Sequence, residues 1–181
     1  MPEVAVIGRF QPFHWGHFEY VSEAGRHSPC LAVGITNPSV ERTRHTGTDP
    51  KRSGEEANPF TYEQRSAMIS STLARLAPHL RPRIVPCDLR SPATLRSSLG
   101  TCDLVALTVY DAWGREKQAL AEAAGYEVVV LWQRTEKVVT GTEVRRRWRN
   151  SLPWDHLVPS GTAEIVRSLT GRLQASPDQA G

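Results

Sequence analysis

Short apolar runs recur along the chain without the polar alternation of half-exposed strands. They cover residues 4–7, 30–35, 84–87, 104–109 and 128–132, and several are rich in β-branched side chains. Runs of this kind are typical of strands that are buried on both faces, as in a parallel sheet covered by helices. The pattern therefore predicts about five parallel strands.

Helical segments are expected between these runs. Residues 18–24 and 116–124 have a helical composition, and the second segment ends at Gly125, a good C-cap. Alternating strands and helices imply right-handed crossovers. We therefore expect an α/β fold, a Rossmann-like doubly wound parallel sheet of about five strands. The longest helix is expected over residues 62–76, with one face formed by Met68, Ile69, Thr72, Leu73 and Leu76.

The C-terminal part is expected to be helical over residues 160–173 and to pack, together with Trp154, on the sheet. Residues 1–175 are expected to form a single domain. Residues 176–181 are small, polar and Pro-containing, so we expect them to form a flexible tail.

The segment between the first predicted strand and the first helix carries the most informative polar residues. Arg9, His14 and His17 follow the apolar run, and Gly16 stands between the two histidines. Phosphates bind at such strand-to-helix positions, because free N–H groups and the helix dipole point at the ligand. Imidazole N–H groups and a guanidinium suit the charge of a reacting triphosphate, and Gly16 would let the backbone approach it. Two other interpretations are ordinary surface or capping histidines and a zinc pair, although no Cys or acidic third ligand lies at zinc-like spacing.

A second phosphate site is predicted after the fifth apolar run. Residues 140–148 combine hydroxyls that can cap a helix, a glycine that permits close approach, and arginines one turn into the helix. The candidates are Thr140, Gly141, Thr142, Arg145 and Arg146. The alternative is a capped surface helix with solvated arginines, which is what we expect of Arg147 and Arg149.

The composition excludes several classes of protein. The chain has 181 residues, 39% of them hydrophobic, which fits one globular domain. Its formal net charge of +3 fits an anionic small-molecule substrate as well as nucleic acid, so the charge alone decides little. A nucleic-acid-binding protein would be expected to show a larger basic excess beside exposed aromatic residues. The sequence shows no run of membrane-spanning length and no signal-peptide pattern. Three scattered cysteines, Cys30, Cys87 and Cys102, indicate buried thiols in a reducing cytoplasm.

A long polar connection covers residues 37–58 and includes Lys51 and Arg52. A connection of this length is either a lid or binding loop, or a solvated surface loop, and the sequence leaves both interpretations open.

Three motifs resemble those of the nucleotidyltransferase superfamily that carries a His-x-Gly-His signature. Residues 8–17, Gly-Arg-Phe-Gln-Pro-Phe-His-Trp-Gly-His, are similar to the longer form in archaeal-type nicotinamide mononucleotide (NMN) adenylyltransferases. Residues 140–147, Thr-Gly-Thr-Glu-Val-Arg-Arg-Arg, resemble that family's Ser-Gly-Thr-Glu-x-Arg-Arg-Arg. Residues 58–65 resemble its Asp-Pro-Phe-Thr-x-x-Glu-Arg, in which Arg65 would hold Glu63, a carbonyl or the ligand.

The resemblance implies transfer of a nucleotide from a nucleoside triphosphate, CTP or ATP, to an acceptor, with pyrophosphate leaving. It assigns catalytic roles to His14, His17 and Arg145. Mg²⁺ would bridge the phosphates, mostly through water, because no dedicated carboxylate cage is apparent. The nucleotide-binding residues that it implies are Gly8, Arg9, Phe10, Gly16, Thr140, Gly141, Thr142 and Arg146.

The acceptor region departs from the NMN enzymes. Asp88 matches the family's aspartate, but Pro92 and Leu95 stand where an Asn and a Trp would hold nicotinamide. Pro92 offers no side-chain hydrogen bond and Leu95 no stacking face. The chain resembles instead a branch that transfers CMP from CTP to a phosphonate, typically phosphonoformate, in phosphonate and phosphinate natural-product pathways. The acceptor-binding residues would then be Asp88, Arg90, Lys51 and Arg52.

Two further hypotheses stay open. One is an NMN adenylyltransferase that makes NAD from ATP and NMN with a relocated nicotinamide pocket. The other is a non-catalytic nucleotide-binding module that kept the phosphate loops. The base is expected to be read by the backbone around residues 133–139, and the sequence does not fix whether the protein is a homo-oligomer.

Overall fold

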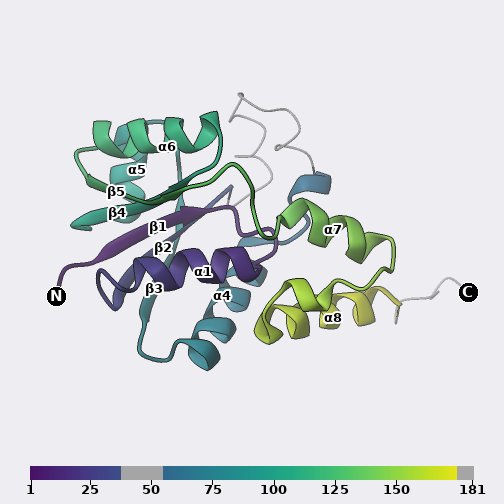
Figure 1. Ribbon diagram of the computed structural model, residues 1–181. Helices are drawn as coiled ribbons and strands as arrows, with labels where there is room; N and C mark the ends of the chain where they lie inside the picture. The colour runs from purple at the N-terminus through teal and green to yellow at the C-terminus, as the bar shows by residue number, and fades with distance from the viewer. Residues whose placement is uncertain (38–54, 175–181) are drawn as a thin grey trace, which may run out of the picture.

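The computed structural model describes residues 1–37 and 55–174, and within them five strands form one parallel sheet in the order β3-β2-β1-β4-β5 (Figure 1). This order confirms the predicted doubly wound topology. Successive strands are added to one side of β1 as far as β3 and to the other side from β4 onwards, so the strand order reverses between β1 and β4. Ligands of such sheets bind at this point, at the carboxyl ends of the strands. The strands are β1 (Val4–Gly8), β2 (Cys30–Thr36), β3 (Arg81–Cys87), β4 (Leu104–Val109) and β5 (Glu127–Gln133).

Helices cover both faces of the sheet. Alternate residues of β1 point to opposite faces: Val4 and Val6 pack in one apolar cluster, and Ala5 and Ile7 pack in another. The first cluster lies under α1 and α4, and the second lies under α5 and α6 (Figure 1). The helices are α1 (Trp15–Ala24), α4 (Tyr62–Leu76), α5 (Pro92–Leu99), α6 (Ala112–Ala123), α7 (Gly141–Arg149) and α8 (Ser160–Gln174), with short turns η1 (Glu55–Ala57) and η2 (Asp155–Leu157).

The two edge strands correct one sequence expectation. We expected all five strands to be buried on both faces, but β3 and β5 are only partly covered along most of their length. Pro82 and Pro86 lie in β3, where they are tolerated because one side of an edge strand makes no ladder hydrogen bonds. The burial prediction holds for the central strands β2, β1 and β4.

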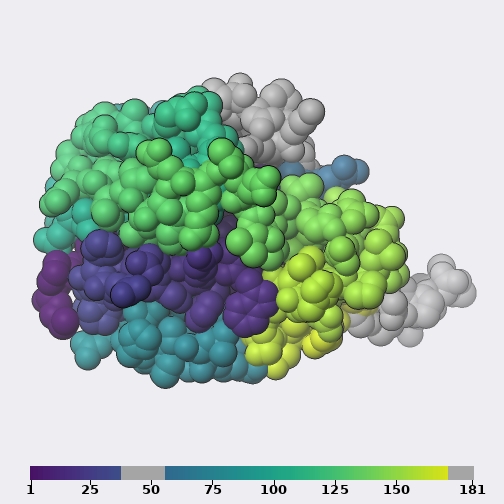
Figure 2. All heavy atoms as spheres, viewed as in Figure 1, coloured from purple at the N-terminus to yellow at the C-terminus, as the bar shows by residue number. Residues whose placement is uncertain are grey.

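The C-terminal helix also packs differently from the expectation. Helix α8 lies mainly against α4 rather than on the sheet. Figure 2 shows the C-terminal part of the chain, in light green and yellow, gathered at one end of the molecule. The crossing is close at Gly161, where a Cβ atom would stand 2.8 Å from Ser71 Oγ. Leu76, expected on the buried face of α4, is 44% exposed, and Arg65 is buried on that helix instead.

Tyr20 marks the point where β1 and β4 stop pairing. The parallel ladder between these strands ends at Val6 and Ala106. The buried Tyr20 hydroxyl then accepts a hydrogen bond from the Ile7 N–H at 3.1 Å and donates to the Ala106 carbonyl at 2.6 Å. The side chain thus satisfies the backbone groups at the switch point, which an unpaired ladder would leave bare.

The structure tests the expectation that the three cysteines are buried thiols. Cys30, Cys87 and Cys102 are all free, and burial raises the pKa of the Cys87 and Cys102 thiols to about 12. Cys30 is only partly buried, which corrects the expectation that all three thiols are buried.

Across residues 1–37 and 55–174, no helix is both long enough and apolar enough to cross a bilayer.

Candidate active site

The two histidines of the first motif cap helix α1 and each other. His14 is the N-cap residue, and its Nδ1 accepts a hydrogen bond from the His17 backbone N–H at 3.3 Å. The His17 Nδ1 accepts in turn from the His14 backbone N–H at 3.4 Å. The two rings stack with centroids 3.6 Å apart and an interplanar angle of 17°. This reciprocal cap is a capping box built from imidazoles in place of the usual Ser and Glu.

The cap fixes the protonation of both rings. Burial lowers the pKa of His14 to about 3, with the positive charges of Lys137 and Arg145 acting in the same direction. Burial also lowers the pKa of His17 well below its usual value, and His14 and Lys137 add to this effect. Both rings are therefore neutral at pH 7. Because each Nδ1 is an acceptor, the remaining proton of each neutral ring lies on Nε2. The capping interpretation of these histidines and the phosphate interpretation are thus compatible, since one nitrogen caps and the other donates.

Gly8 and Phe10 support the histidines from below. Phe10 is fully buried with a φ of 53°, and its ring meets the His17 ring edge-on at 4.9 Å. A Cβ atom on Gly8 would lie 2.8 Å from the Phe10 ring. Of these two predicted nucleotide-binding residues, Phe10 thus packs against the His17 ring, and Gly8 leaves room for the Phe10 ring.

The second motif meets the first at the start of α7. Thr140 is the N-cap, and its Oγ1 accepts from the Glu143 N–H at 3.2 Å. Arg145 is 6% exposed and donates to the Gln11 carbonyl at 2.5 Å and to Thr142 Oγ1 at 3.2 Å. The sequence left open whether Thr140 or Thr142 caps the helix, and the structure assigns the cap to Thr140.

Two glycines allow the motifs to approach. A Cβ atom on Gly141 would stand 2.6 Å from the Gln11 carbonyl oxygen and 3.0 Å from Arg145 Nη1. A Cβ atom on Gly16 would stand 3.3 Å from the His14 ring and 3.5 Å from the Val139 carbonyl oxygen. The loop before α7 therefore lies directly against the loop before α1, as the connection running from β5 to α7 shows (Figure 1).

Gln11 joins all three motifs, and sequence reasoning missed it. Its buried side-chain amide donates to the Phe60 carbonyl at 2.8 Å and accepts from the Phe60 N–H at 3.1 Å. Its own carbonyl receives Arg145. The signal was present in the sequence, because a polar amide amid apolar residues next to a proline must find buried partners.

Arg65 is a structural anchor. The sequence left three partners open for it, and the structure selects backbone carbonyls. It is 1% exposed and donates to the carbonyls of Thr61, Arg9, Thr36 and Asn37 at 2.7–3.1 Å. These groups lie at the start of α4 and after β1 and β2. One guanidinium therefore fixes the carboxyl ends of two neighbouring strands.

The remaining arginines of α7 all have hydrogen-bond partners within the protein. Arg146 and Arg147 both pair with Glu143, at 2.8 and 2.7 Å. These two partners hold the pKa of the Glu143 carboxyl at about 2. Arg149 donates to the Glu56 carbonyl at 2.6 Å. We expected Arg147 and Arg149 to be solvated, but both are hydrogen-bonded within the protein. Arg146 pairs with Glu143, a carboxylate of its own helix.

The site concentrates positive charge. Burial, together with the charges of Arg9 and Arg149, lowers the pKa of Arg145 to about 10. Arg65 is shifted to about 10 in the same way, with its pKa lowered by burial and by Arg9. Like charges held together in a partly buried place favour an anion beside them. With two neutral Nε2–H groups and the N-termini of α1 and α7, this arrangement suits a polyphosphate.

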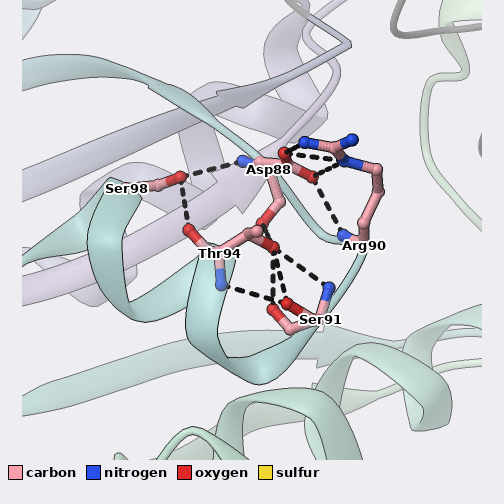
Figure 3. Close-up of polar contacts among 5 residues, drawn as sticks. All are labelled: Asp88, Arg90, Ser91, Thr94 and Ser98. Atoms are coloured by element: carbon pink, nitrogen blue, oxygen red, sulfur yellow. Dashed lines mark hydrogen bonds and ion pairs between the residues drawn. The ribbon is translucent and has the colours of Figure 1, made fainter.

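The predicted acceptor residues form a separate group after β3 (Figure 3). The Arg90 guanidinium donates through Nε to Asp88 Oδ1 and Oδ2, at 3.0 and 2.9 Å, and through Nη2 to Oδ2 at 2.5 Å. The Arg90 backbone N–H also donates to Oδ1, at 3.0 Å. The Asp88 N–H donates to Ser98 Oγ at 3.1 Å, while Ser91 and Thr94 form a capping box at the start of α5. Arg90 remains half exposed. Lys51 and Arg52, the other two predicted acceptor residues, lie outside the described residues.

The acceptor group and the histidines share one edge of the sheet. Asp88 follows β3 and the histidines follow β1, with β2 between them. The two groups therefore follow strands that are separated by one strand of the sheet. Leu95 is fully buried in the core under α5, and Pro92 is the first residue of that helix.

A metal cage is absent from the part of the chain that the structure describes. Within residues 1–37 and 55–174, no three His, Cys, Asp or Glu residues are grouped so that they could hold a metal ion. A divalent ion would here depend on phosphate oxygens and water, which is the usual mode for Mg²⁺.

The fold and the site define a class: an α/β protein with a cluster of arginines and histidines, suited to a polyphosphate, at the switch point of its sheet. Residues 5–147 match the family described as cytidylyltransferase-like, and the chain belongs to this family of nucleotidyltransferases. It is 40% identical over 163 residues to a phosphonoformate cytidylyltransferase of Streptomyces viridochromogenes, covering 90% of this chain and 89% of the relative. It is 30% identical over 169 residues to a nicotinamide-nucleotide adenylyltransferase of Methanococcus aeolicus, covering 92% and 88%.

Solved structures share the fold at low sequence identity. A bifunctional NMN adenylyltransferase/ADP ribose pyrophosphatase from Francisella tularensis has a TM-score of 0.55 and 17% identity, covering all of this chain and 59% of that one. Thermotoga maritima TmcAL, bound with alpha-thio ATP, has a TM-score of 0.64 and 11% identity, covering 95% and 56%. These likenesses confirm the predicted fold.

Proposed function

We propose that this protein transfers CMP from CTP to phosphonoformate and releases pyrophosphate. The observation that carries the proposal is the 40% identity with the Streptomyces viridochromogenes enzyme over nearly the whole of both chains. The burial of Leu95 and the position of Pro92 support it, because neither residue can hold a nicotinamide ring or its amide.

The reaction would be an in-line displacement at phosphorus. A phosphonate oxygen of the acceptor forms a bond to the α-phosphorus while the bond to the bridging oxygen breaks. Pyrophosphate leaves with the electron pair of that bond. The attacking oxygen is already ionised at neutral pH, so no general base is needed. The enzyme's contribution is alignment and neutralisation of charge.

The His pair and Arg145 would bind the reacting phosphates. The Nε2–H groups of His14 and His17 would donate to α- and β-phosphate oxygens, since Nδ1 of each ring is used in the cap. Arg145 would exchange part of its contact with Thr142 for a phosphate oxygen. Arg9 and the N–H groups at the start of α7 would hold the rest of the chain of phosphates. Arg146, which Glu143 holds, is a weaker candidate.

Magnesium would be carried by the phosphates. No cage of protein ligands is found among the described residues, so the ion would be held by phosphate oxygens and water. When bound, it would neutralise charge on the triphosphate. The three free cysteines fit a reaction in the cytoplasm.

Arg90 would bind the acceptor. In the structure its guanidinium forms a fork with the Asp88 carboxylate, a geometry that a phosphonate or carboxylate of the substrate can also satisfy. Asp88 therefore preorganises Arg90 until the substrate arrives. Lys51 and Arg52 are proposed to add charge to the same acceptor.

The alternative substrate pair is ATP and NMN, which the 30% identity to the Methanococcus aeolicus enzyme favours. The test is pyrophosphate release in the presence of Mg²⁺, with CTP and ATP each crossed against phosphonoformate and NMN. Release with CTP and phosphonoformate alone supports the proposal. Release with ATP and NMN alone would overturn it and imply a relocated nicotinamide pocket. Binding of CTP with no turnover of any pair would favour the non-catalytic module.

A further inference from the structure

The connection from β5 to α7 turns back across the end of β4 towards the histidines (Figure 1). The Arg134 N–H donates to the Val109 carbonyl at the end of β4, at 3.2 Å. Lys137 Nζ then lies 5.0 Å from the centre of the Tyr110 ring, just after β4. Two residues later, the Val139 carbonyl reaches Gly16, between the two histidines. The connection that contains Lys137 therefore runs from the edge strand β5 past the end of β4.

Tyr110 is itself fixed in place. Its hydroxyl accepts a hydrogen bond from Trp132 Nε1 at 2.8 Å, which ties it to β5. An ammonium group is attracted to the face of an aromatic ring, and this contact orients the charge. Lys137 itself is exposed to solvent.

The neighbouring cation on the same connection is turned towards α1. Arg134 pairs with both carboxylate oxygens of Glu19 on α1, at 3.1 and 3.3 Å, and stacks over Trp132 at 4.5 Å. Its charge is therefore engaged by a carboxylate. Lys137 acts electrostatically on both His14 and His17, since its charge opposes protonation of either ring and lowers the pKa of each. That influence agrees with its position beside the pair.

We propose that Lys137 is a further catalytic residue, which binds the phosphates of the nucleoside triphosphate beside His14 and His17, and that Tyr110 is the residue that positions it. The inference rests on the proposed function only in taking a nucleoside triphosphate as substrate. The Lys137 ammonium stabilises the negative charge that accumulates on pyrophosphate as its bond to the α-phosphorus breaks. It does so as a hydrogen-bond donor and gives up no proton. A compact ammonium on a flexible stem suits a group whose charge grows and then departs.

The first test compares Lys137→Met with Arg134→Met, which removes the same charge three residues away. Turnover with CTP and phosphonoformate is measured alongside the affinity for inorganic triphosphate by calorimetry. Inorganic triphosphate carries the phosphate chain without base or acceptor. We expect Lys137→Met to lower kcat about 100-fold and the triphosphate affinity about tenfold, and Lys137→Arg to recover part of both. Arg134→Met should change each value by less than about threefold.

The second test separates positioning from folding. Tyr110→Phe keeps the ring face and loses only the hydroxyl, whereas Tyr110→Leu removes the face. Tyr110→Phe should keep most of the activity, and Tyr110→Leu should approach Lys137→Met. The double variant Tyr110→Leu/Lys137→Met should be no worse than Lys137→Met alone, because both changes remove one interaction.

The outcomes distinguish this inference from the proposed function. If the unchanged protein does not use CTP and phosphonoformate, the proposed function fails, while the triphosphate affinities still decide the role of Lys137. If the unchanged protein is active and Lys137→Met matches Arg134→Met in both measurements, the inference about Lys137 is overturned and the proposed function stands.

Discussion

His14 and His17 each accept, through Nδ1, a hydrogen bond from the backbone N–H of the other. One pair of side chains thus caps α1 through Nδ1, and the proton of each neutral ring is left on Nε2. The structural role and the chemical role rest on different nitrogens, so they can be separated by mutation.

Replacement of His14 by Asn should separate cap from donor. Asn is a good N-cap whose Oδ1 can accept from the His17 N–H, but it has no group at the Nε2 position. We expect His14→Asn to keep the free energy of unfolding within about 0.5 kcal/mol and to lose at least about 100-fold in kcat. His14→Ala should lose the activity and about 1 kcal/mol as well. Urea denaturation and pyrophosphate release measure the two effects. Full activity in His14→Asn would show that Nε2 of this ring does not act.

The His pair should make stability depend on pH. The pKa of His14 in the folded protein is about 3 and that of His17 is also lowered, so the unfolded chain binds more protons below about pH 6.5. The free energy of unfolding is therefore fully retained above about pH 6.5 and falls as the pH drops below it. The fall should approach about 1.4 kcal/mol per pH unit for each histidine.

Urea titrations at about pH 7.5, 6.5 and 5.5 measure this fall. The carboxylates with lowered pKa values, such as Glu143, titrate at lower pH and leave this window to the histidines. In His14→Asn the slope of the free energy of unfolding against pH, between about pH 6.5 and 5.5, should be smaller by the contribution of one histidine, up to about 1.4 kcal/mol per pH unit. An unchanged slope would mean that His14 is not buried in its neutral form.

Gly141→Ala should damage the junction between the two phosphate motifs. The new Cβ would stand 2.6 Å from the Gln11 carbonyl and 3.0 Å from Arg145 Nη1. Overpacking of this kind costs about 1–3 kcal/mol, although alanine favours a helix over glycine by up to about 1 kcal/mol. Gly16→Ala, with contacts of 3.3 Å or more, is the milder comparison. Thermal unfolding of both variants should rank Gly141→Ala as the less stable, and an increase in its Tm would contradict the close approach of the Gln11 carbonyl to Gly141.

Gln11→Leu tests the residue that joins the three motifs. The change leaves the buried N–H and carbonyl of Phe60 without their side-chain partners. We expect a loss of about 2–4 kcal/mol in the free energy of unfolding, from two unsatisfied groups. Gln11→Glu keeps one of the two bonds and should also weaken triphosphate binding, because it adds a negative charge beside Arg145. If Gln11→Leu unfolds like the unchanged protein, the amide contacts do not hold the site together.

Arg90→Ala tests the acceptor site. We expect the KM for phosphonoformate to rise at least about tenfold with little change in the KM for CTP, because Arg90 lies two strands from the histidines. Arg90→Lys should recover little, since an ammonium cannot form the fork seen with Asp88. Arg75→Ala, which removes an exposed ion pair with Glu164 elsewhere, is the control. A higher KM for CTP instead would place Arg90 in the nucleotide site.

The sequence supported correct predictions wherever a local pattern was sufficient. The apolar runs, the helix start at residues 140–142 and the glycine after α6 are local features, so their interpretation carried over to the structure, which then chose Thr140 over Thr142 as the cap. The motifs likewise indicated which ends of the sheet carry the chemistry. Contacts between distant segments were a different matter: Arg65 had three plausible partners in the sequence, and only the positions of β1 and β2 selected four carbonyls.

By itself, the sequence determined the class of fold and the family, because periodicity, caps and motifs are encoded in neighbouring residues. It also predicted the residues that would carry phosphate chemistry. Only the tertiary structure decided that Gln11 links three motifs, that Glu143 pairs with Arg146, that α8 packs on α4, and that Lys137 lies over the ring of Tyr110. These relationships depend on how far the chain turns between elements. The course of the chain between elements is set by packing over the whole sheet, so it cannot be predicted from any short stretch of residues.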